Sequence, residues 1–342
     1  MQSIFKDFKK YSSLFIGFII FFSCDSEDQS LQRTQGYALG TTYSISYVSN
    51  TLTPEQLTHN VDSLFKVLNQ SLSTYIPDSD ISKINKGDSL VVVDDHFVKV
   101  YRKATEVWKR TRGFFDPTVG ALVNAYGFGP GKRLKTVSQN QRDSILVFTG
   151  WSKTKLTEKF TISKKYPNIY FDFNALAKGY AVDVLAQYLI QSQVDSFLVE
   201  IGGEIVAQGK SPRSGQNWKI AIDDPKQGEE RSFIQTVSLN NQALATSGNY
   251  RKFEINEETG LRSAHSINPI TGEAIPSKVL SASVIAPDCM TADAYATALM
   301  VMPIEDSQKL IDSIPELEAY WIVSDSNKGV MELFSSGFPK ED

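Results

Sequence analysis

Two residues near the C-terminal part of the sequence have the types and spacing of a metal site. Asp293 and Thr297 stand four positions apart in Thr291-Ala-Asp-Ala-Tyr-Ala-Thr-Ala, which places both on one face of a helix. The surrounding residues are mostly apolar, so this carboxylate should be buried and therefore paired, hydrogen-bonded or metal-bound. Oxygen ligands favour Mg²⁺ over zinc. Alternatively, Thr297 bonds back to the Asp293 carbonyl, and Asp293 is a helix-start carboxylate.

A second pair of charges stands near the middle of the chain. Asp172 lies between Phe171 and Phe173 at the end of an apolar segment, and Lys178 follows one turn into a predicted helix. The pair raises the same question as Asp293, because a buried carboxylate must be paired, hydrogen-bonded or metal-bound. The structural alternative is an ion pair at a strand–helix junction, and the pattern alone does not separate the two interpretations.

Two further titratable residues lie in turn-forming segments. His265 opens His-Ser-Ile-Asn-Pro-Ile-Thr-Gly, and an imidazole with a pKa of about 6.5 is a candidate base. The alternative for His265 is a hydrogen-bonded loop histidine. Asp116 precedes Pro117, where it could simply form a turn.

The composition excludes several classes of function. The net charge is −4 with no long basic block, which argues against nucleic-acid binding. Two cysteines and three histidines cannot supply a disulfide framework, a thiolate zinc site or a multi-histidine metal centre. The sequence also lacks the P-loop, the dinucleotide fingerprint, the nucleophile elbow and the zinc-protease motif.

These candidate residues need a mixed set of elements to position them. Helical periodicity and caps predict helices beginning with the capping box Thr53-Pro54-Glu55-Gln56, over 97–108 with a stop at Gly113, over about 175–191 and over 291–302. Strand patterns are found at 42–48, 197–201, 218–222, 234–239 and 279–286, with a turn at Asn240-Asn241. Because strands and helices do not alternate strictly, we expect an α+β fold with largely antiparallel sheet.

Taken in order, a series of short motifs resembles the ApbE family of FAD:protein FMN transferases. The motifs run from Leu39-Gly40-Thr41 to Thr297, nearly the whole of the mature chain expected after signal removal. They are Ser73-Thr74-Tyr75, D-P-T-V-G at 116–120 with G-F-G-P at 127–130, A-K-G-Y-A-V-D at 177–183, the V-E-I-G-G-E strand at 199–204, the A-T-S-G-N-Y turn at 245–250, H-S-I-N-P-x-T-G at 265–272 and A-D-A-x-A-T-A at 292–298.

The resemblance implies a fold and a set of site residues. The fold would be related to the T-fold, with the flavin site in a cleft between subdomains. Asp293 and Thr297 match metal ligands, with Ala175 giving a backbone carbonyl, and His265 matches a loop histidine near the reacting phosphate. The matches to flavin-nucleotide contacts are Leu39, Tyr75, Phe114, Phe115, Asp116, Asp172, Lys178 and Ile267.

The resemblance further implies the reaction. The FMN half of FAD would pass, with Mg²⁺, to a Thr or Ser hydroxyl of a partner protein, releasing AMP. The partner would be a respiratory or electron-transfer subunit with a Ser/Thr-Gly-Ala-Thr/Ser-type motif. Hydrolysis of FAD to FMN and AMP and non-catalytic flavin binding remain alternatives. Asn268 and Ala296 stand where many or some relatives carry acids, so the metal site would hold fewer charges.

The N-terminal segment has the features of a targeting signal. Three lysines precede an uncharged stretch from Tyr11 to Phe22, which is too short to span a bilayer. Cys24 and an acidic run follow, as in a bacterial lipoprotein signal, although a signal peptide with an incidental cysteine is the alternative. We expect a signal peptide at 1–23, a flexible tether at 24–34 and one catalytic unit at 35–342. Lipidation of Cys24 would hold the enzyme on a membrane facing the periplasm, which fits the resemblance.

Overall fold

A single antiparallel sheet organises the protein, so the expected α+β fold is confirmed. The computed structural model describes residues 30–224, 232–249, 253–255, 262–264, 266–274, 278–325 and 329–339. Eight strands of the described chain form the sheet in the order β1-β2-β5-β6-β9-β12-β13-β14. Their bounds are β1 Gln32–Ala38, β2 Thr41–Tyr47, β5 Phe197–Ile201, β6 Glu204–Gln208, β9 Gln242–Gly248, β12 Val279–Ala286, β13 Glu318–Asp325 and β14 Gly329–Phe334.

The remaining described strands form antiparallel pairs outside this sheet. They are β3 (Thr154–Leu156) with β4 (Ile162–Lys164), β7 (Trp218–Asp223) with β8 (Phe233–Leu239), and β10 (Phe253–Ile255) with β11 (Arg262–Ala264). The helices are α1 Pro54–Leu72, α2 Asp80–Asn85, α3 Asp95–Arg110, α4 Gly120–Tyr126, α5 Gln139–Leu146, α6 Asn174–Gln191, α7 Cys289–Leu299 and α8 Ile304–Asp312, with a 3-10 turn, η1, at Trp151–Lys153. No helix in these parts of the chain is both long and apolar enough to cross a bilayer.

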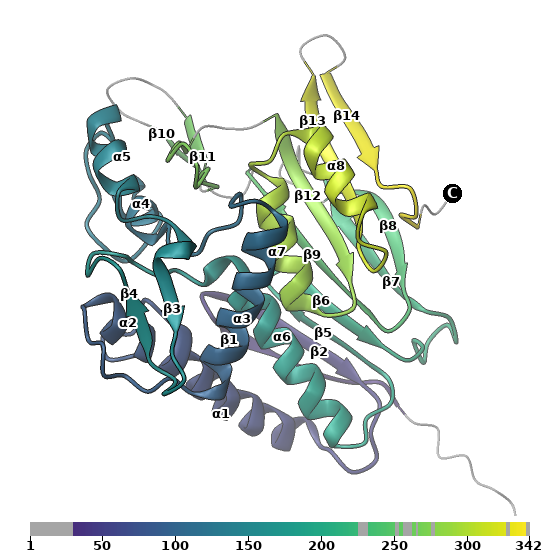
Figure 1. The fold of residues 1–342 in the computed structure, drawn as a ribbon. Helices are drawn as coiled ribbons and strands as arrows, with labels where there is room; N and C mark the ends of the chain where they lie inside the picture. The colour runs from purple at the N-terminus through teal and green to yellow at the C-terminus, as the bar shows by residue number, and fades with distance from the viewer. Residues whose placement is uncertain are drawn as a thin grey trace, which may run out of the picture.

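The two faces of the sheet are covered differently. Helices α1, α6 and α7 pack on one face, with α6 and α7 beside each other over the central strands, and α3 packs against these three helices (Figure 1). Alternate side chains of the strands, such as Val199 on β5 and Ala245 on β9, point into the core beneath these helices. Their neighbours Leu244 and Ile205 point the other way, into a smaller core shared with the β7–β8 hairpin. The sheet therefore separates a helical side from a hairpin side.

Local sequence explains where the main helices start and end. The predicted capping box of α1 is present, with Thr53 and Gln56 each accepting from the other's backbone amide. The prediction for 175–191 is confirmed by α6 within one residue. Helix α7 begins two residues before the predicted start because the Asp288 side chain accepts from the Thr291 amide at 2.8 Å. It ends at Leu299, ahead of Pro303.

The predicted strands at 197–201 and 279–286 are confirmed, but two predictions about turns and strands were wrong. The A-T-S-G-N-Y segment was expected to be a turn, yet β9 extends through Gly248. Its small residues have low strand propensity, and they suit a strand lying directly under α7. V-E-I-G-G-E was expected to be one strand, but Gly202 and Gly203 have φ of +62° and +106° and turn β5 back into β6. Strand β1 starts at Gln32, inside the region expected to be a tether.

Candidate active site

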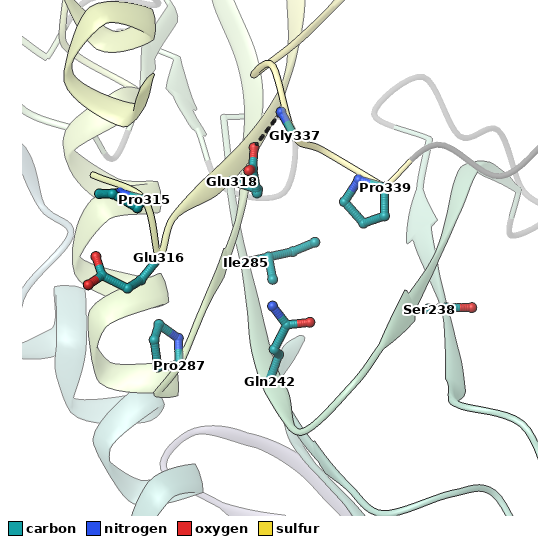
Figure 2. A pocket seen from close by; sticks show the side chains of 9 residues that line it. All are labelled: Ser238, Gln242, Ile285, Pro287, Pro315, Glu316, Glu318, Gly337 and Pro339. Atoms are coloured by element: carbon teal, nitrogen blue, oxygen red, sulfur yellow. Dashed lines mark hydrogen bonds between the residues drawn. The ribbon is translucent and has the colours of Figure 1, made fainter. Parts of the chain in front are cut away.

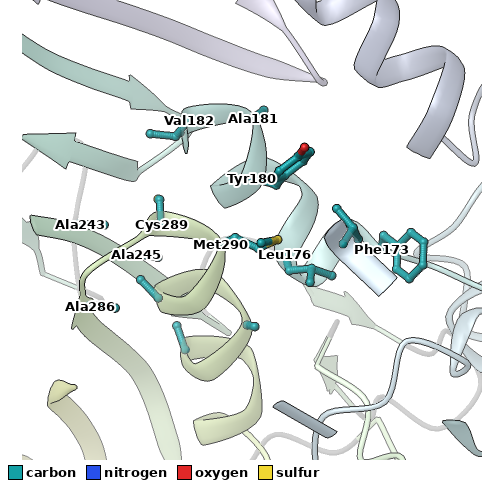
Figure 3. Packing of buried hydrophobic residues seen from close by; sticks show 14 of the residues in the cluster. Phe173, Leu176, Tyr180, Ala181, Val182, Ala243, Ala245, Ala286, Cys289 and Met290 are labelled. Carbon is teal, nitrogen blue, oxygen red and sulfur yellow. The ribbon is translucent and has the colours of Figure 1, made fainter. Parts of the chain in front are cut away.

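Small residues let α6 and α7 approach closely, and this contact builds the site. A Cβ placed on Gly179 of α6 would overlap the carbonyl oxygen of Cys289 and lie 2.8 Å from the Cβ of Asp293. Figure 3 shows the apolar part of the contact, where Met290 of α7 lies beside Leu176 of α6. Position 179 therefore has to be glycine for the helices to meet at this distance.

Asp293 is anchored to α6 by a backbone hydrogen bond. The amide of Gly179 donates to Oδ2 of Asp293 at 3.0 Å, and the Asp293 residue is buried with 3% exposure. In an α-helix the amide of residue 179 also faces the carbonyl of residue 175. The Ala175 carbonyl therefore belongs to the same turn of α6 as the amide that holds Asp293, and its role as a metal ligand stays a prediction.

Thr297 adds a hydroxyl on the same side of α7. Its Oγ1 lies 3.3 Å from Oγ of Ser247 on β9, and both residues are partly buried. The structural alternative, in which Asp293 serves as the helix-start carboxylate, does not hold because Asp288 fills that position. Asp293 and Thr297 lie four residues apart in α7, as the spacing predicted, with Asp293 contacting α6 and Thr297 contacting β9.

Lys178 does not pair with Asp172 as the structural alternative supposed. Its Nζ forms an ion pair and a short hydrogen bond with Oε1 of Glu204, the first residue of β6. Glu204 has 3% exposure, and its Oε2 is buried without a hydrogen-bond partner. We refer to Lys178, Glu204, Ser247, Asp293 and Thr297 as the α6–α7 cluster.

Charges in this cluster shift one another's ionisation. Burial alone lowers the pKa of Lys178, but the carboxylates of Glu204 and Asp293 outweigh it and raise that pKa. Burial raises the pKa of Asp293 while the Lys178 ammonium opposes the shift. Burial likewise raises the pKa of Glu204, again opposed by Lys178. One ammonium thus faces two carboxylates, which leaves the cluster with an acidic excess when all three groups are charged.

Asp172 lies in the loop that leads into α6. Its side chain accepts from the Asn174 amide at 2.9 Å at the start of α6, and its own amide donates to the Pro117 carbonyl at 2.8 Å. The pKa of Asp172 is raised by burial. Electrostatic interaction with Asp172 raises the pKa of Tyr75, after the larger effect of burial, so Tyr75 lies nearby. Two predicted nucleotide contacts thus interact electrostatically, and one of them, Asp172, directly precedes α6.

Asp116 has strong structural ties within its own loop. Oδ1 accepts from the amide and hydroxyl of Thr118 at 2.8 and 2.6 Å, and Oδ2 accepts from the Trp151 amide at 2.8 Å. The turn-forming interpretation of Asp116 is confirmed. Its predicted contact with a flavin nucleotide stays a prediction, as do those of its neighbours Phe114, which is partly buried, and Phe115, which is buried.

The remaining predicted site residues lie in other parts of the chain. Leu39 occupies the β1–β2 turn with φ of +52°, and the following Thr41 side chain contacts the position of Gly202, just before Glu204. Ile267 is buried against Leu122 of α4. His265 and Cys24 lie outside the described residues, so their predicted roles stay predictions.

Two cavities lie away from the α6–α7 cluster. One of about 380 Å³ lies on the hairpin side and is lined by Thr41, Gly202 and Thr246 among others. The other, of about 430 Å³, lies near Pro287 and Glu318 (Figure 2). In Figure 2 the Gly337 amide donates to Glu318 across its rim. None of the predicted site residues lines either cavity, and the expected cleft for the flavin stays a prediction.

The donor chemistry of the cluster fits a hard cation. The described residues contain no group of three or more His, Cys, Asp or Glu side chains placed to share a metal. Mg²⁺, however, is usually bound through one or two carboxylates, with waters and substrate phosphates completing its shell. The Asp293 carboxylate, the Thr297 hydroxyl and the Ala175 carbonyl meet that requirement, and the orphaned Oε2 of Glu204 adds negative potential.

Sequence reasoning missed three residues of this site, namely Gly179, Glu204 and Ser247. All three stand inside the quoted motifs, but none was assigned a role. Glu204 carried a usable signal, because an acid followed by Ile-Val-Ala after a glycine turn predicts a buried carboxylate that needs a partner. Gly179 and Ser247 carried none, since their roles depend on which elements touch.

Comparison with known proteins agrees with this architecture. The sequence model of the ApbE family matches residues 39–321. An FAD:protein FMN transferase of Haemophilus influenzae is 36% identical over 93% of this chain and 93% of its own length. A flavin transferase ApbE structure from Vibrio cholerae superposes with a TM-score of 0.81 and 34% identity, covering 90% of this chain and 99% of that one. The ApbE protein structure of Thermotoga maritima gives 0.80 at 27% identity, covering 91% and 100%.

The fold and the buried oxygen-rich cluster thus define an α+β protein of the flavin-transferase type. The chain belongs to the ApbE family.

Proposed function

We propose that this protein is an FAD:protein FMN transferase. The observation that carries the proposal is the hydrogen bond that holds the buried Asp293 of α7 to the Gly179 amide of α6, with the Lys178 ammonium interacting electrostatically with Asp293. It is supported by curated relatives of that name that align over about nine tenths of this chain. The substrate would be FAD, and the second substrate a protein with an accessible Thr or Ser hydroxyl in a Ser/Thr-Gly-Ala-Thr/Ser-type motif.

The proposed reaction is a phosphoryl transfer between two oxygens. The acceptor hydroxyl oxygen attacks the FMN-side phosphorus of FAD, the bond from that phosphorus to the bridging oxygen breaks, and AMP leaves. His265 accepts the hydroxyl proton. Lys178 supplies positive charge beside the pyrophosphate, and its partner Glu204 fixes the ammonium in place.

We also propose that the reaction requires Mg²⁺, bound at the α6–α7 cluster. Asp293, Thr297 and the Ala175 carbonyl would hold Mg²⁺, and Asn268 and Ala296 add no charge. When bound, the ion neutralises charge on the pyrophosphate oxygens. Burial of Asp293 keeps water from screening this interaction. Tyr75 and Asp172, which interact electrostatically, would contact the nucleotide.

We further propose that the protein is a lipoprotein of the cell envelope. The signal-like segment ends at Cys24, and the described fold begins a few residues later with β1 at Gln32. A lipid on Cys24 would hold the catalytic unit close to the membrane, facing the periplasm. There it would meet membrane-bound respiratory or electron-transfer acceptors.

A reconstituted reaction tests the role of His265. The protein is incubated with FAD, Mg²⁺ and a purified acceptor domain, and the mass of the acceptor is measured by mass spectrometry. We expect the wild-type protein to add one FMN per acceptor and the His265→Ala variant to add it about 100-fold or more slowly, within the range for general base catalysis. Transfer at the wild-type rate by the variant would remove His265 from the mechanism.

The same assay separates the alternatives. Hydrolysis would release FMN and AMP without any acceptor and leave the acceptor mass unchanged. A flavin carrier would leave FAD intact throughout a long incubation. Only transfer produces AMP and modified acceptor in equal amounts.

A further inference from the structure

Lys178 lies near two buried carboxylates but is joined to one. Its Nζ donates to Glu204, whereas Asp293 accepts from the Gly179 amide. The Lys178 ammonium nevertheless acts on the ionisation of both carboxylates. Lys178 and Gly179 are consecutive residues, so the ammonium stem starts beside the backbone group that holds Asp293.

Two requirements compete for the negative charge in this cluster. A buried ammonium needs a carboxylate partner, because an unpaired buried charge is strongly destabilising. A cation site at Asp293 needs that carboxylate free of the ammonium. With Glu204 ionised, both requirements are met, since Glu204 neutralises Lys178 and Asp293 keeps its charge.

We infer that Glu204 is a positioning residue that holds Lys178 on β6 and thereby keeps Asp293 available to Mg²⁺. This inference rests on the magnesium site proposed above. Asp293 is the other carboxylate whose charge acts on Lys178, and it is held by the amide of the next residue, Gly179. Without the Glu204 charge, Lys178 would pair with Asp293 and compete with the cation for it.

The backbone around Glu204 suits this role. Glu204 is fixed at the start of β6 by the tight Gly202–Gly203 turn and is almost wholly buried, so its carboxylate has little freedom to follow the lysine. The Lys178 side chain is less deeply buried, with one-third of its surface exposed. The more deeply buried Glu204 carboxylate thus determines where the ammonium lies.

Magnesium binding to four proteins tests the inference. Mg²⁺ alone is titrated by calorimetry into the wild type, Glu204→Gln, Lys178→Met and the double variant, and a thermal unfolding curve is recorded for each. We expect Glu204→Gln to weaken Mg²⁺ binding by about 10- to 100-fold, the usual range for residues that support metal ligands. Adding Lys178→Met should restore affinity to within a few-fold of the wild type, because the competing ammonium is gone.

Glu200 offers a matched control. It lies on the same β5–β6 hairpin but lines the cavity on the other face of the sheet, where it accepts from the Gly203 amide at 2.8 Å. Glu200→Gln removes the same charge from the same hairpin and should leave Mg²⁺ affinity unchanged.

The possible results lead to different conclusions. Wild-type affinity in Glu204→Gln would overturn the inference. Equally weak binding by Glu204→Gln and the double variant would also overturn it, since Glu204 would then act as a ligand or a purely structural group. If the wild type itself binds no Mg²⁺, the proposed metal site fails and the inference fails with it, a result distinct from the loss of rescue alone.

Discussion

Burial gives the side chains of the α6–α7 cluster their chemical character. Asp293 accepts a hydrogen bond from Gly179 and has 3% exposure, so its charge interacts through a medium of lower polarity than water. A carboxylate in that setting attracts a cation more strongly than an exposed one would. Burial raises the pKa of Asp293, and Lys178 opposes the shift. Keeping this carboxylate charged in the folded protein therefore costs free energy.

Replacing Asp293 with asparagine separates charge from shape. Asp293→Asn keeps an oxygen that can accept from Gly179 but removes the charge, so we expect Mg²⁺ affinity and FMN transfer to fall by about 100-fold, at the upper end for residues around a metal. The melting temperature should stay level or rise, because a buried carboxylate has been neutralised.

Calorimetry and thermal unfolding measure the two effects of Asp293→Asn. The pair Thr297→Ser and Thr297→Val provides the control, since serine keeps the hydroxyl and valine removes it. Undiminished Mg²⁺ binding by Asp293→Asn would exclude Asp293 as a ligand.

At the scale of elements, the site exists because α6 and α7 approach closely at Gly179. Gly179 allows that contact, and two backbone amides at the start of α7 bind the Asp183 carboxylate of α6 at 2.7 and 2.8 Å. The position of Asp293 therefore depends on both helices. Changes at the contact should alter stability and transfer together.

Gly179→Ala tests the closeness of the helices. Alanine favours a helix by about 1 kcal/mol over glycine, but here its Cβ would overlap the Cys289 carbonyl. We expect a net loss of about 1–3 kcal/mol in the free energy of unfolding, as for overpacking, together with slower transfer. Urea unfolding measures it, with the exposed α6 change Gln187→Ala as a near-neutral control. A fully stable and active Gly179→Ala would show that the contact can widen freely.

Asp183 should make stability depend on pH. Burial, followed by the nearby Asp288, raises its pKa to about 7, against the opposing amides of Cys289 and Met290. The folded state therefore holds the proton more tightly than the unfolded state, whose pKa is about 4. This contribution to stability is present below about pH 4 and is lost as the pH rises towards about 7.

The neutral variant Asp183→Asn lacks that titration. Relative to the wild type, its free energy of unfolding should increase between about pH 4 and about pH 7. Urea unfolding at several pH values measures this difference. A difference that is constant across the range would show that Asp183 ionises as freely in the folded protein as in the unfolded chain.

At the scale of the whole molecule, the features that the sequence predicted correctly were those that a local sequence pattern determines. The i, i+4 spacing of Asp293 and Thr297 predicted their shared face correctly, and the capping box at Thr53 predicted the start of α1. The pairing of Lys178 with Glu204 was not predictable in this way, because it joins α6 to a strand placed by the order of the sheet. Strand β9 was missed for a similar reason, since burial under α7 overrides its weak propensity.

The proposed lipid on Cys24 would attach the whole protein to a membrane. We expect the expressed protein to carry lipid on Cys24 and to partition into detergent, whereas Cys24→Ala should stay in the aqueous phase. Mass spectrometry of the N-terminal peptide identifies the modification. Because the sequence has two cysteines, Cys289→Ala is the natural control and should keep the lipid. Aqueous partition of the wild-type protein would overturn the anchor.

The most direct test of the account is the mass of an acceptor domain after incubation with FAD, Mg²⁺ and the wild-type protein. The account predicts a gain of one FMN on a Thr or Ser of the acceptor, an equal amount of AMP, and no gain with Asp293→Asn. An unmodified acceptor accompanied by free FMN and AMP, or equal modification by Asp293→Asn, would contradict it.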